Sequence, residues 1–206
     1  MASGQKIWWD VRRDERFIEA IHQLDPVRQR REICINNTVG NPSMALIRRA
    51  VVDRVGAFDD SLRWGQDWEL FIRLASAGPI VVADEPVILY RWHVGGLSHE
   101  NRAKRLGVIH SISRRAIASY EPRWYRPVLR LRAWSSIEFE RAQLSLKLRE
   151  PRSKQLWHAL RALVTFPLSR GGEKAKLVAR VMIGERQYQR LRRRVGAVGL
   201  VRSDSG

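Results

Sequence analysis

The residues best suited to chemistry lie in one stretch, residues 56–74, which reads GAFDDSLRWGQDWELFIRL. Trp64 and Trp68 flank Asp67 where a helix is expected to begin. Large aromatic side chains beside a carboxylate form a surface on which sugar rings and other amphipathic ligands stack. A carboxylate held in such a place can also accept a proton, so Asp67 is a candidate for proton transfer.

Asp67 also has a purely structural interpretation. An aspartate at a helix start accepts backbone N–H groups and is favoured by the helix dipole, so its position alone favours a cap. Trp68 is in phase with Phe71 and Ala75 and fits a core position, whereas Trp64 precedes the helix and is freer to face a ligand. The two roles are compatible, because a capping bond would hold the carboxylate still.

The elements that must position these residues show a mixed pattern up to about residue 100. Apolar periodicity predicts helices over 14–24, 49–55 and 67–75, with Gly56 in the left-handed conformation after the second. Apolar runs predict strands over 33–35, 43–47, 79–83 and 87–93, with a turn at 84–86 between the last two. The sequence therefore predicts an α/β region.

Beyond residue 101 the periodicity is helical throughout. Apolar faces are expected at Leu106, Ile109, Ile112 and Ala116; at Leu156, Leu160 and Leu163; and at Leu177, Val181, Tyr188, Leu191 and Val195. Residues 1–100 hold 13 Lys and Arg against 14 Asp and Glu, whereas residues 101–206 hold 25 against 7, so the second region accounts for the entire positive excess of the chain, whose net charge is +17. We predict two domains, an α/β domain over 1–100 and a basic helical extension over 101–206.

The order of motifs over residues 41–98 resembles the acceptor-side half of family 2 glycosyltransferases. In that family a strand and a helix lead to a G-G-F-D-E-like turn, an E-D-W-x-L-x-x-R helix and a Y-R-x-H strand end. This chain has GAFDD at 56–60, QDWELFIR at 66–73 and YRWH at 90–93, in the same order. The resemblance implies a partial Rossmann-like glycosyltransferase domain of the A type.

The resemblance also implies a reaction, the transfer of a sugar from a nucleotide-sugar donor to an acceptor hydroxyl with inversion at the anomeric carbon. Asp67 stands at the position of the catalytic base. Trp64, Asp59 and Gln66 are expected on the acceptor side, Gln66 replacing the glutamate that the family usually has. Arg91 is a candidate for the donor diphosphate or for an ion pair with Asp84 or Glu85, and the resemblance makes His93 a candidate for the divalent metal or the diphosphate.

The donor-binding features of the family are missing from this sequence. Relatives hold Mg²⁺ or Mn²⁺ and the donor diphosphate with an Asp-x-Asp, but Asp10-Val11-Arg12 lacks the second carboxylate and no Gly-rich phosphate loop is present. We therefore expect a C-terminal part of a glycosyltransferase, either truncated or partnered with a separate donor-binding chain, and inactive alone. Charge stabilisation of the leaving group would be lacking.

The basic region predicts an anionic partner. Leu177, Val181, Tyr188 and Leu191 oppose Lys174, Lys176, Arg180, Arg190, Arg192 and Arg193, a pattern typical of a helix lying on an anionic membrane surface. With one cysteine, no export signal and no apolar run long enough to span a bilayer, the expected location is cytoplasmic and peripheral, at the inner face of the cell membrane, with a saccharide or lipid-linked saccharide as acceptor.

Two other classes of function stay open. A charge of this size attracts nucleic acid, although no zinc-finger spacing, RNP-like strand or helix-turn-helix pattern supports that reading. The chain could instead be a non-enzymatic scaffold that binds glycan through the acceptor side.

Overall fold

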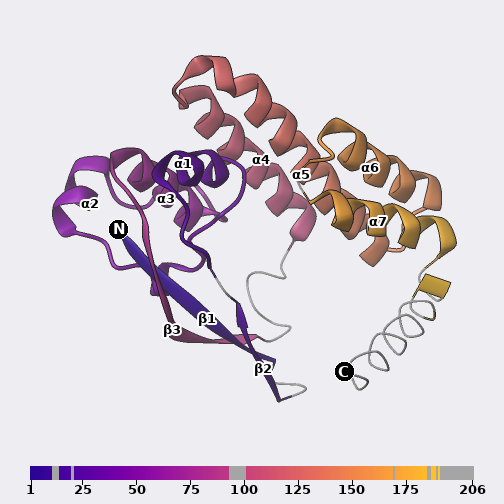
Figure 1. Cartoon of the computed structure of the whole chain (residues 1–206), viewed down its shortest axis with the longest axis horizontal. Coiled ribbons are helices and arrows are strands. Elements are labelled where there is room, and N and C mark those ends of the chain that lie inside the picture. Colours follow the sequence, from indigo (N-terminus) through magenta and orange to yellow (C-terminus); the bar gives the residue numbers. More distant parts are fainter. Residues whose placement is uncertain are drawn as a thin grey trace, which may run out of the picture. The chain divides into compact units, whose positions relative to one another are not determined.

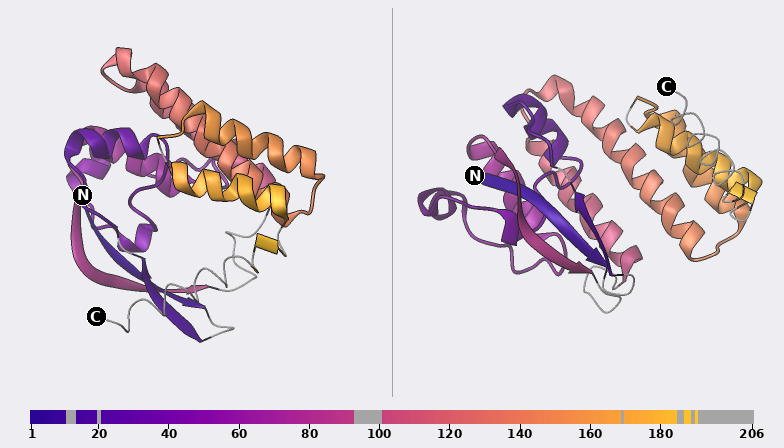
Figure 2. Two further views of the ribbon diagram at one scale, coloured as in Figure 1. Left: turned by 45° about the vertical axis from the view of Figure 1, so that its right-hand side comes forward. Right: turned by 60° about the horizontal axis from the view of Figure 1, so that its bottom comes forward.

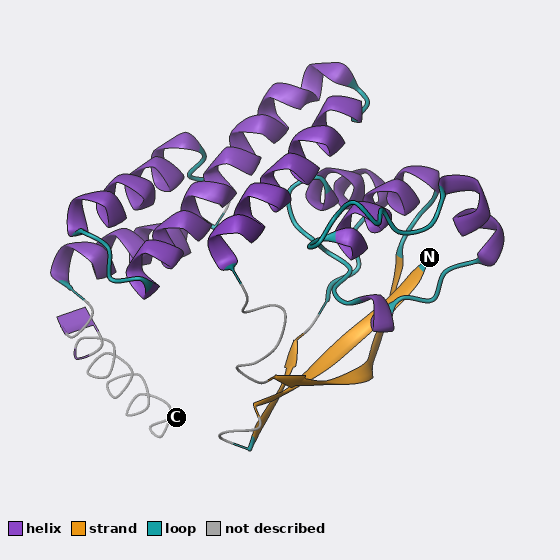
Figure 3. Cartoon of the chain, turned by 180° about the vertical axis from the view of Figure 1, so that it is seen from behind, coloured by secondary structure: helices purple, strands orange, loops and turns teal. Residues whose placement is uncertain are grey.

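The computed structural model describes residues 1–10, 14–19, 21–92, 101–168, 170–184, 187, 188 and 190 of the 206-residue chain. The described chain is mixed α/β, with one small sheet and a larger share of helix (Figure 3). Two compact units divide it, Met1–Ala133 (unit 1) and Trp134–Gly206 (unit 2). Compactness and charge thus divide the chain at different places, because the basic composition begins near residue 101 and unit 1 extends beyond it.

The sheet of unit 1 contains β1 (Ala2–Asp10), β2 (Glu15–Glu19) and β3 (Val81–Trp92) in the order β2-β1-β3. β1 runs antiparallel to β2 and parallel to β3, and the two long strands lie side by side (Figures 1 and 2). Parallel neighbours require a long crossover, and the chain between them supplies it as a series of helices. The first helix of this series is α1 (Pro26–Ile33), capped by the Asp25 side chain.

The helix predicted over 14–24 is wrong, because residues 15–19 form β2. Phe17 pairs with Trp8 of β1 across the ladder, and their rings stack with centroids 6.0 Å apart. Tyr90 of β3 meets the same indole edge-on at 4.7 Å. Adjacent apolar residues such as Phe17 and Ile18 suit two faces of a strand as well as one face of a helix, and the pairing with β1 decides between them.

The four predicted strands also differ from the structure. Residues 79–83 and 87–93 are predicted as two strands, but within the described residues β3 is one strand, and a register irregularity opposite Ser3 and Gln5 accommodates Pro86. Residues 33–35 end α1 and turn, and residues 43–47 contain the 3₁₀ helix η1 (Pro42–Met44) with a single bridge from Ala2 to Leu46.

The helices around the candidate residues follow the prediction. α2 (Arg49–Val55) is followed by Gly56 at φ 87°, and α3 (Gln66–Ala77) ends at Gly78. α3 buries Trp68, Leu70, Phe71, Leu74 and Ala75, in a core that also includes Ile33, Val39, Ile80 and Ile112. Ile112 belongs to α4 (Arg102–Ser119), whose expected apolar face is confirmed.

Arg73 of α3 fixes the chain that leads into the candidate site. It pairs with Glu69 at 2.7 Å, as the i,i+4 spacing predicts, and donates to the carbonyl oxygens of Val55, Gly56 and Ala57. One guanidinium therefore binds the end of α2 and the following turn to α3.

Unit 2 is helical within its described residues. After the 3₁₀ helix η3 (Arg123–Tyr125), α5 (Arg126–Lys147) runs from unit 1 into unit 2, where α6 (Arg152–Thr165) and α7 (Gly171–Ile183) follow. Phe139, Ala142, Ala159, Ala162 and Leu177 form the apolar core of this unit. No helix in the described part of the chain has both the length and the apolarity to span a membrane.

Candidate functional site

A cavity of about 500 Å³ lies in unit 1 at the start of α3. Three of the predicted site residues, Trp64, Gln66 and Asp67, line it together. The other lining residues come from the loop after α1, from η1, from the chain between α2 and α3, and from α3 and α4: Asn37, Pro42, Phe58, Arg63, Gly65, Trp68, Arg105 and Ile109. The cavity falls within the size range of small-molecule sites and combines aromatic walls with a few polar groups.

Asp67 is the second residue of α3 and not its cap. Gly65 occupies the N-cap position at φ 76°, and no side chain caps the helix there. The Asp67 carboxylate instead accepts the backbone N–H of Trp68 at 2.8 Å. This bond satisfies one of the free N–H groups of the first turn and orients the carboxylate. The carboxylate is therefore held by the start of the helix, as predicted, but from inside the first turn and not from the cap position.

Burial raises the pKa of Asp67 above its ordinary value, although the backbone hydrogen bond to Trp68 N–H opposes the shift. Partial removal from water disfavours the charged carboxylate. A raised pKa makes the carboxylate a better proton acceptor than a fully hydrated aspartate. The environment of Asp67 therefore suits a general base.

The two tryptophans divide as the helical phase predicts. Trp68 is buried, and its Nε1–H donates to the Ile33 carbonyl at 2.6 Å, which ties α3 to the end of α1. Trp64 is half-buried in the cavity wall, with the Arg63 guanidinium 5.4 Å from its ring centre. The Nε1 atom of Trp64 is buried and has no hydrogen-bond partner among the described residues. A ligand oxygen in the cavity could accept this N–H group.

Asp59 does not line the cavity, but the adjacent Phe58 does. The Asp59 carboxylate accepts the backbone N–H of Ser61 at 3.0 Å and the Ser61 hydroxyl at 2.5 Å. These bonds lower the pKa of Asp59. Its observed role is to form the turn that presents Phe58.

The donor-side candidates lie elsewhere. Arg91 is on β3, outside the cavity lining, and its guanidinium lies 5.2 Å from the ring centre of Trp9. Arg16 of β2 lies 5.3 Å from the same ring. His93 falls outside the described residues. The structure thus brings together the acceptor-side candidates other than Asp59.

Three polar residues of the cavity were missed by sequence reasoning. Asn37 shapes its loop by accepting the N–H groups of Val39 and Gly40, whereas Arg63 and Arg105 bring positive charge to the wall. Arg63 adjoins Trp64 in sequence, so its proximity to the site could have been predicted from the sequence. Arg105 and Asn37 reach the cavity only through the packing of α4 and of the loop after α1, for which the sequence holds no local signal.

A divalent metal does not fit the cavity lining by itself. Mg²⁺ and Mn²⁺ take several oxygen ligands, whereas Asp67 is the only carboxylate among the residues that line this cavity. In the described ranges, no group of three or more His, Cys, Asp or Glu residues could hold a metal ion.

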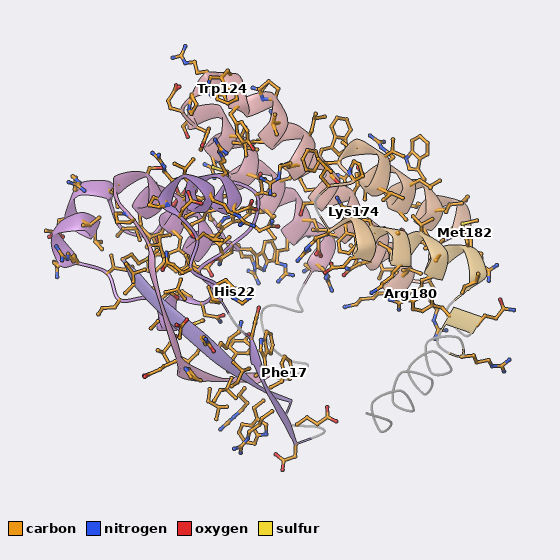
Figure 4. The ribbon with its side chains drawn as sticks, viewed as in Figure 1. Phe17, His22, Trp124, Lys174, Arg180 and Met182 are labelled. Carbon is orange, nitrogen blue, oxygen red and sulfur yellow. The ribbon has the colours of Figure 1, made fainter. Side chains whose placement is uncertain are left out.

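The predicted membrane-facing side of the last helix has another role where it is described. Leu177 and Val181 are buried in unit 2, and Lys174, expected on the polar side, is buried beside them. The Lys174 ammonium donates to Ser135 Oγ and to the Phe166 carbonyl, both at 2.7 Å, while Arg180 lies nearer the end of α7 (Figure 4). This face packs inside the unit because α5 and α6 supply the partner surface.

Comparison with protein-family models, with curated proteins and with solved structures found no match for this chain.

Proposed function

We propose that unit 1 is the acceptor-binding half of an inverting glycosyltransferase and that Asp67 is its catalytic base. In this proposal the cavity holds a saccharide, and a nucleotide-sugar-binding half supplies the donor, in the same polypeptide or in another. The observation that carries the proposal is the meeting of Trp64, Gln66 and Asp67 in one cavity, with the carboxylate partly buried and oriented.

The chemistry requires one proton acceptor at the attacking hydroxyl. As the acceptor oxygen bonds to the anomeric carbon, the bond from that carbon to the diphosphate oxygen breaks and the hydroxyl proton passes to an Asp67 oxygen. The hydroxyl becomes acidic as the new bond forms, so a carboxylate suffices when it is held in place. The bond from Trp68 N–H holds it, and burial raises its proton affinity.

Trp64 and Gln66 would bind the sugar. An indole presents an apolar face to the C–H side of a sugar ring, while amide and indole N–H groups bind hydroxyl oxygens. The unpartnered Nε1 of Trp64 is one such donor. The two arginines in the wall favour an acceptor that carries a negative group, such as a phosphate or a carboxylate.

The first test measures binding to the chain as it stands. A panel of simple saccharides and sugar phosphates is titrated while the indole N–H resonances of the protein are followed by NMR. We expect Trp64→Ala to weaken binding about tenfold, since an aromatic contact contributes on the order of 1 kcal/mol. Trp124→Ala, which removes an exposed tryptophan outside the cavity lining, is the matched control and should bind normally.

The second test separates binding from catalysis. Asp67→Asn keeps the shape and the hydrogen-bond acceptor, so it should bind the same saccharides as the wild type. In an assay with the nucleotide-sugar-binding half present, sugar transfer should fall by about 10² or more when the base is removed. Transfer that survives in Asp67→Asn would show that Asp67 is not the base, and saccharide binding without transfer in either protein would favour a glycan-binding scaffold.

A further inference from the structure

The outer face of α6 carries a stripe of exposed apolar side chains. Trp157, Leu160 and Val164 are 58%, 40% and 77% exposed, and with Arg161 they follow the i, i+3, i+4, i+7 spacing of one helix face. Leu168, just beyond the helix, is 87% exposed. The opposite face, with Gln155, Ala159 and Ala162, is buried in unit 2. Helix α6 therefore has apolar side chains on both its buried and its exposed face.

Arg161 lies close to two tryptophans, one on α6 and one on α5. Its guanidinium carbon is 5.2 Å from the ring centre of Trp157 and 5.1 Å from that of Trp134 of α5, which is 49% exposed. The Trp134 Nε1–H also donates to the buried Glu138 carboxylate at 3.2 Å. The three side chains form a cluster in which one guanidinium lies close to both indole rings, and we call it the Trp–Arg–Trp patch.

Unit 2 as a whole carries a net positive charge. Residues 134–206 hold 16 Lys and Arg against 6 Asp and Glu. Among the described acids of unit 2, Glu138 is buried beside His158, Trp134 and Arg141, and Glu150 pairs with Lys154 at 2.7 Å. A partner that meets the patch must therefore accept apolar side chains and offer negative charge.

We propose that the Trp–Arg–Trp patch, together with Leu160, Val164 and Leu168, docks unit 2 on the surface of an anionic lipid bilayer. Tryptophan rings suit the headgroup region, aliphatic side chains enter the acyl boundary, and arginine binds lipid phosphates. The proposal is independent of the cavity in unit 1. It assigns membrane contact to the exposed face of α6, because the apolar face of α7 packs internally.

Two other occupants fit less well. A second copy of the chain would bring two positively charged units together, which mutual repulsion disfavours. Single-stranded nucleic acid stacks on tryptophan and arginine, but it has no use for the exposed Val164 and Leu168, which continue the stripe beyond the aromatic rings. An anionic bilayer uses the aromatic, aliphatic and cationic groups at once.

The test is flotation of the whole chain with vesicles of phosphatidylcholine, with and without phosphatidylglycerol. We expect the chain to bind only to the anionic vesicles and this binding to be lost when salt is added. Trp157→Ala and Val164→Ser should each weaken binding about tenfold, and Arg161→Gln about fivefold. The matched controls are Trp124→Ala, Met182→Ser and Arg180→Gln, which lie outside the stripe and should float like the wild type (Figure 4). Trp124 and Met182 are exposed, and Arg180 is half-buried.

Three results would overturn the proposal. They are no binding to anionic vesicles, equal weakening by the stripe and control variants, or vesicle binding that the stripe variants leave unchanged. Light scattering and titration with a single-stranded oligonucleotide cover the rival occupants: self-association or nucleotide binding that depends on Trp157, without vesicle binding, would assign the face to that partner. Circular dichroism of each variant checks its fold, and Trp157→Phe retains an aromatic ring if Trp157→Ala unfolds.

Discussion

At the scale of single residues, Asp67 combines a structural and a chemical role. Its carboxylate accepts the Trp68 N–H of the first turn of α3, and its partial burial raises its pKa. Both effects come from one position, the second residue of a helix that begins at the wall of a cavity. The site residue is therefore oriented by the bond that also stabilises the helix start.

The pH dependence of stability tests the environment of Asp67. Because its pKa is higher in the folded than in the unfolded protein, the folded state holds the proton more tightly, and the free energy of unfolding falls as pH rises through the interval between the two values. Asp67→Asn removes this loss and keeps the hydrogen-bond acceptor. In urea unfolding at pH 7, the free energy of unfolding of the variant should equal or exceed that of the wild type. At about pH 3, below the ordinary aspartate pKa, the variant should show no gain in stability.

Asp59→Asn serves as the control, because the pKa of Asp59 is shifted in the opposite direction from that of Asp67. The bonds from Ser61 lower the pKa of Asp59, so its contribution to stability is present above the ordinary pKa and is lost as pH falls through the lowered one. The variant should therefore gain nothing at pH 7. A loss of stability in Asp67→Asn that is confined to neutral pH would contradict the assigned burial effect.

At the scale of the element, α3 places the site, and the glycines at its two ends differ in what they do. Gly65 before the helix has φ 76°, and a Cβ there would lie 2.8 Å from Ile112 Cδ1 of the buried core. Gly78 after the helix is extended at φ 172°, and a Cβ added there would meet only open space. Only the first position requires glycine, for its conformation and for the close approach of α4.

Alanine at these two positions gives the corresponding prediction. Gly65→Ala should reduce the free energy of unfolding by about 1–2 kcal/mol through the left-handed conformation alone, with a further loss from the contact with Ile112. Gly78→Ala should stay within about 0.5 kcal/mol of the wild type. Thermal and urea unfolding of both variants measure the difference, and equal effects would show that the N-cap geometry does not constrain α3.

At the scale of the whole molecule, the two units are stabilised differently. Unit 1 has two apolar clusters, one around α3 and one that joins α4 to the first part of α5. Within its described residues, unit 2 has a small apolar core and two buried charged residues, Glu138 and Lys174, each held by hydrogen bonds. Its stability therefore depends on the pairing of polar groups that are removed from water.

Glu138→Gln tests this dependence. Burial would raise the pKa of Glu138, but hydrogen bonds from His158 and Trp134 outweigh it and lower the pKa. The carboxylate thus stabilises unit 2 above the ordinary glutamate pKa, and this contribution is lost as pH falls through the lowered value. We expect the variant to lose about 2–3 kcal/mol at pH 7 and the difference to narrow below about pH 4.

Hydrogen exchange at the amides of α6 and α7 measures this effect in unit 2 itself. Glu173→Gln is the control, since Glu173 is exposed and lies 3.7 Å from Arg170 in a surface pair that contributes little. If Glu173→Gln reduced the protection from exchange as much as Glu138→Gln, the buried Glu138–His158 pair would not be specifically important for the stability of unit 2.

The sequence alone was enough for features that depend on neighbours three or four residues apart. It predicted α2, α3, the apolar face of α4, the glycine after α2 and the Glu69–Arg73 pair, because helix periodicity and end signals are local. It also singled out Trp64, Gln66 and Asp67, whose adjacency at a helix start is visible in the chain.

Contacts between distant segments decided the rest. Residues 15–19 became a strand because β1 supplies their ladder partners and Trp8 stacks on Phe17, and β3 stays one strand because β1 runs beside it. Asn37 and Arg105 reached the cavity through the packing of α1 and α4. Leu177 and Val181 of α7 turned inward, whereas Trp157, Leu160 and Val164 of α6 were left facing water. An amphipathic pattern shows that a face is apolar but not what covers it.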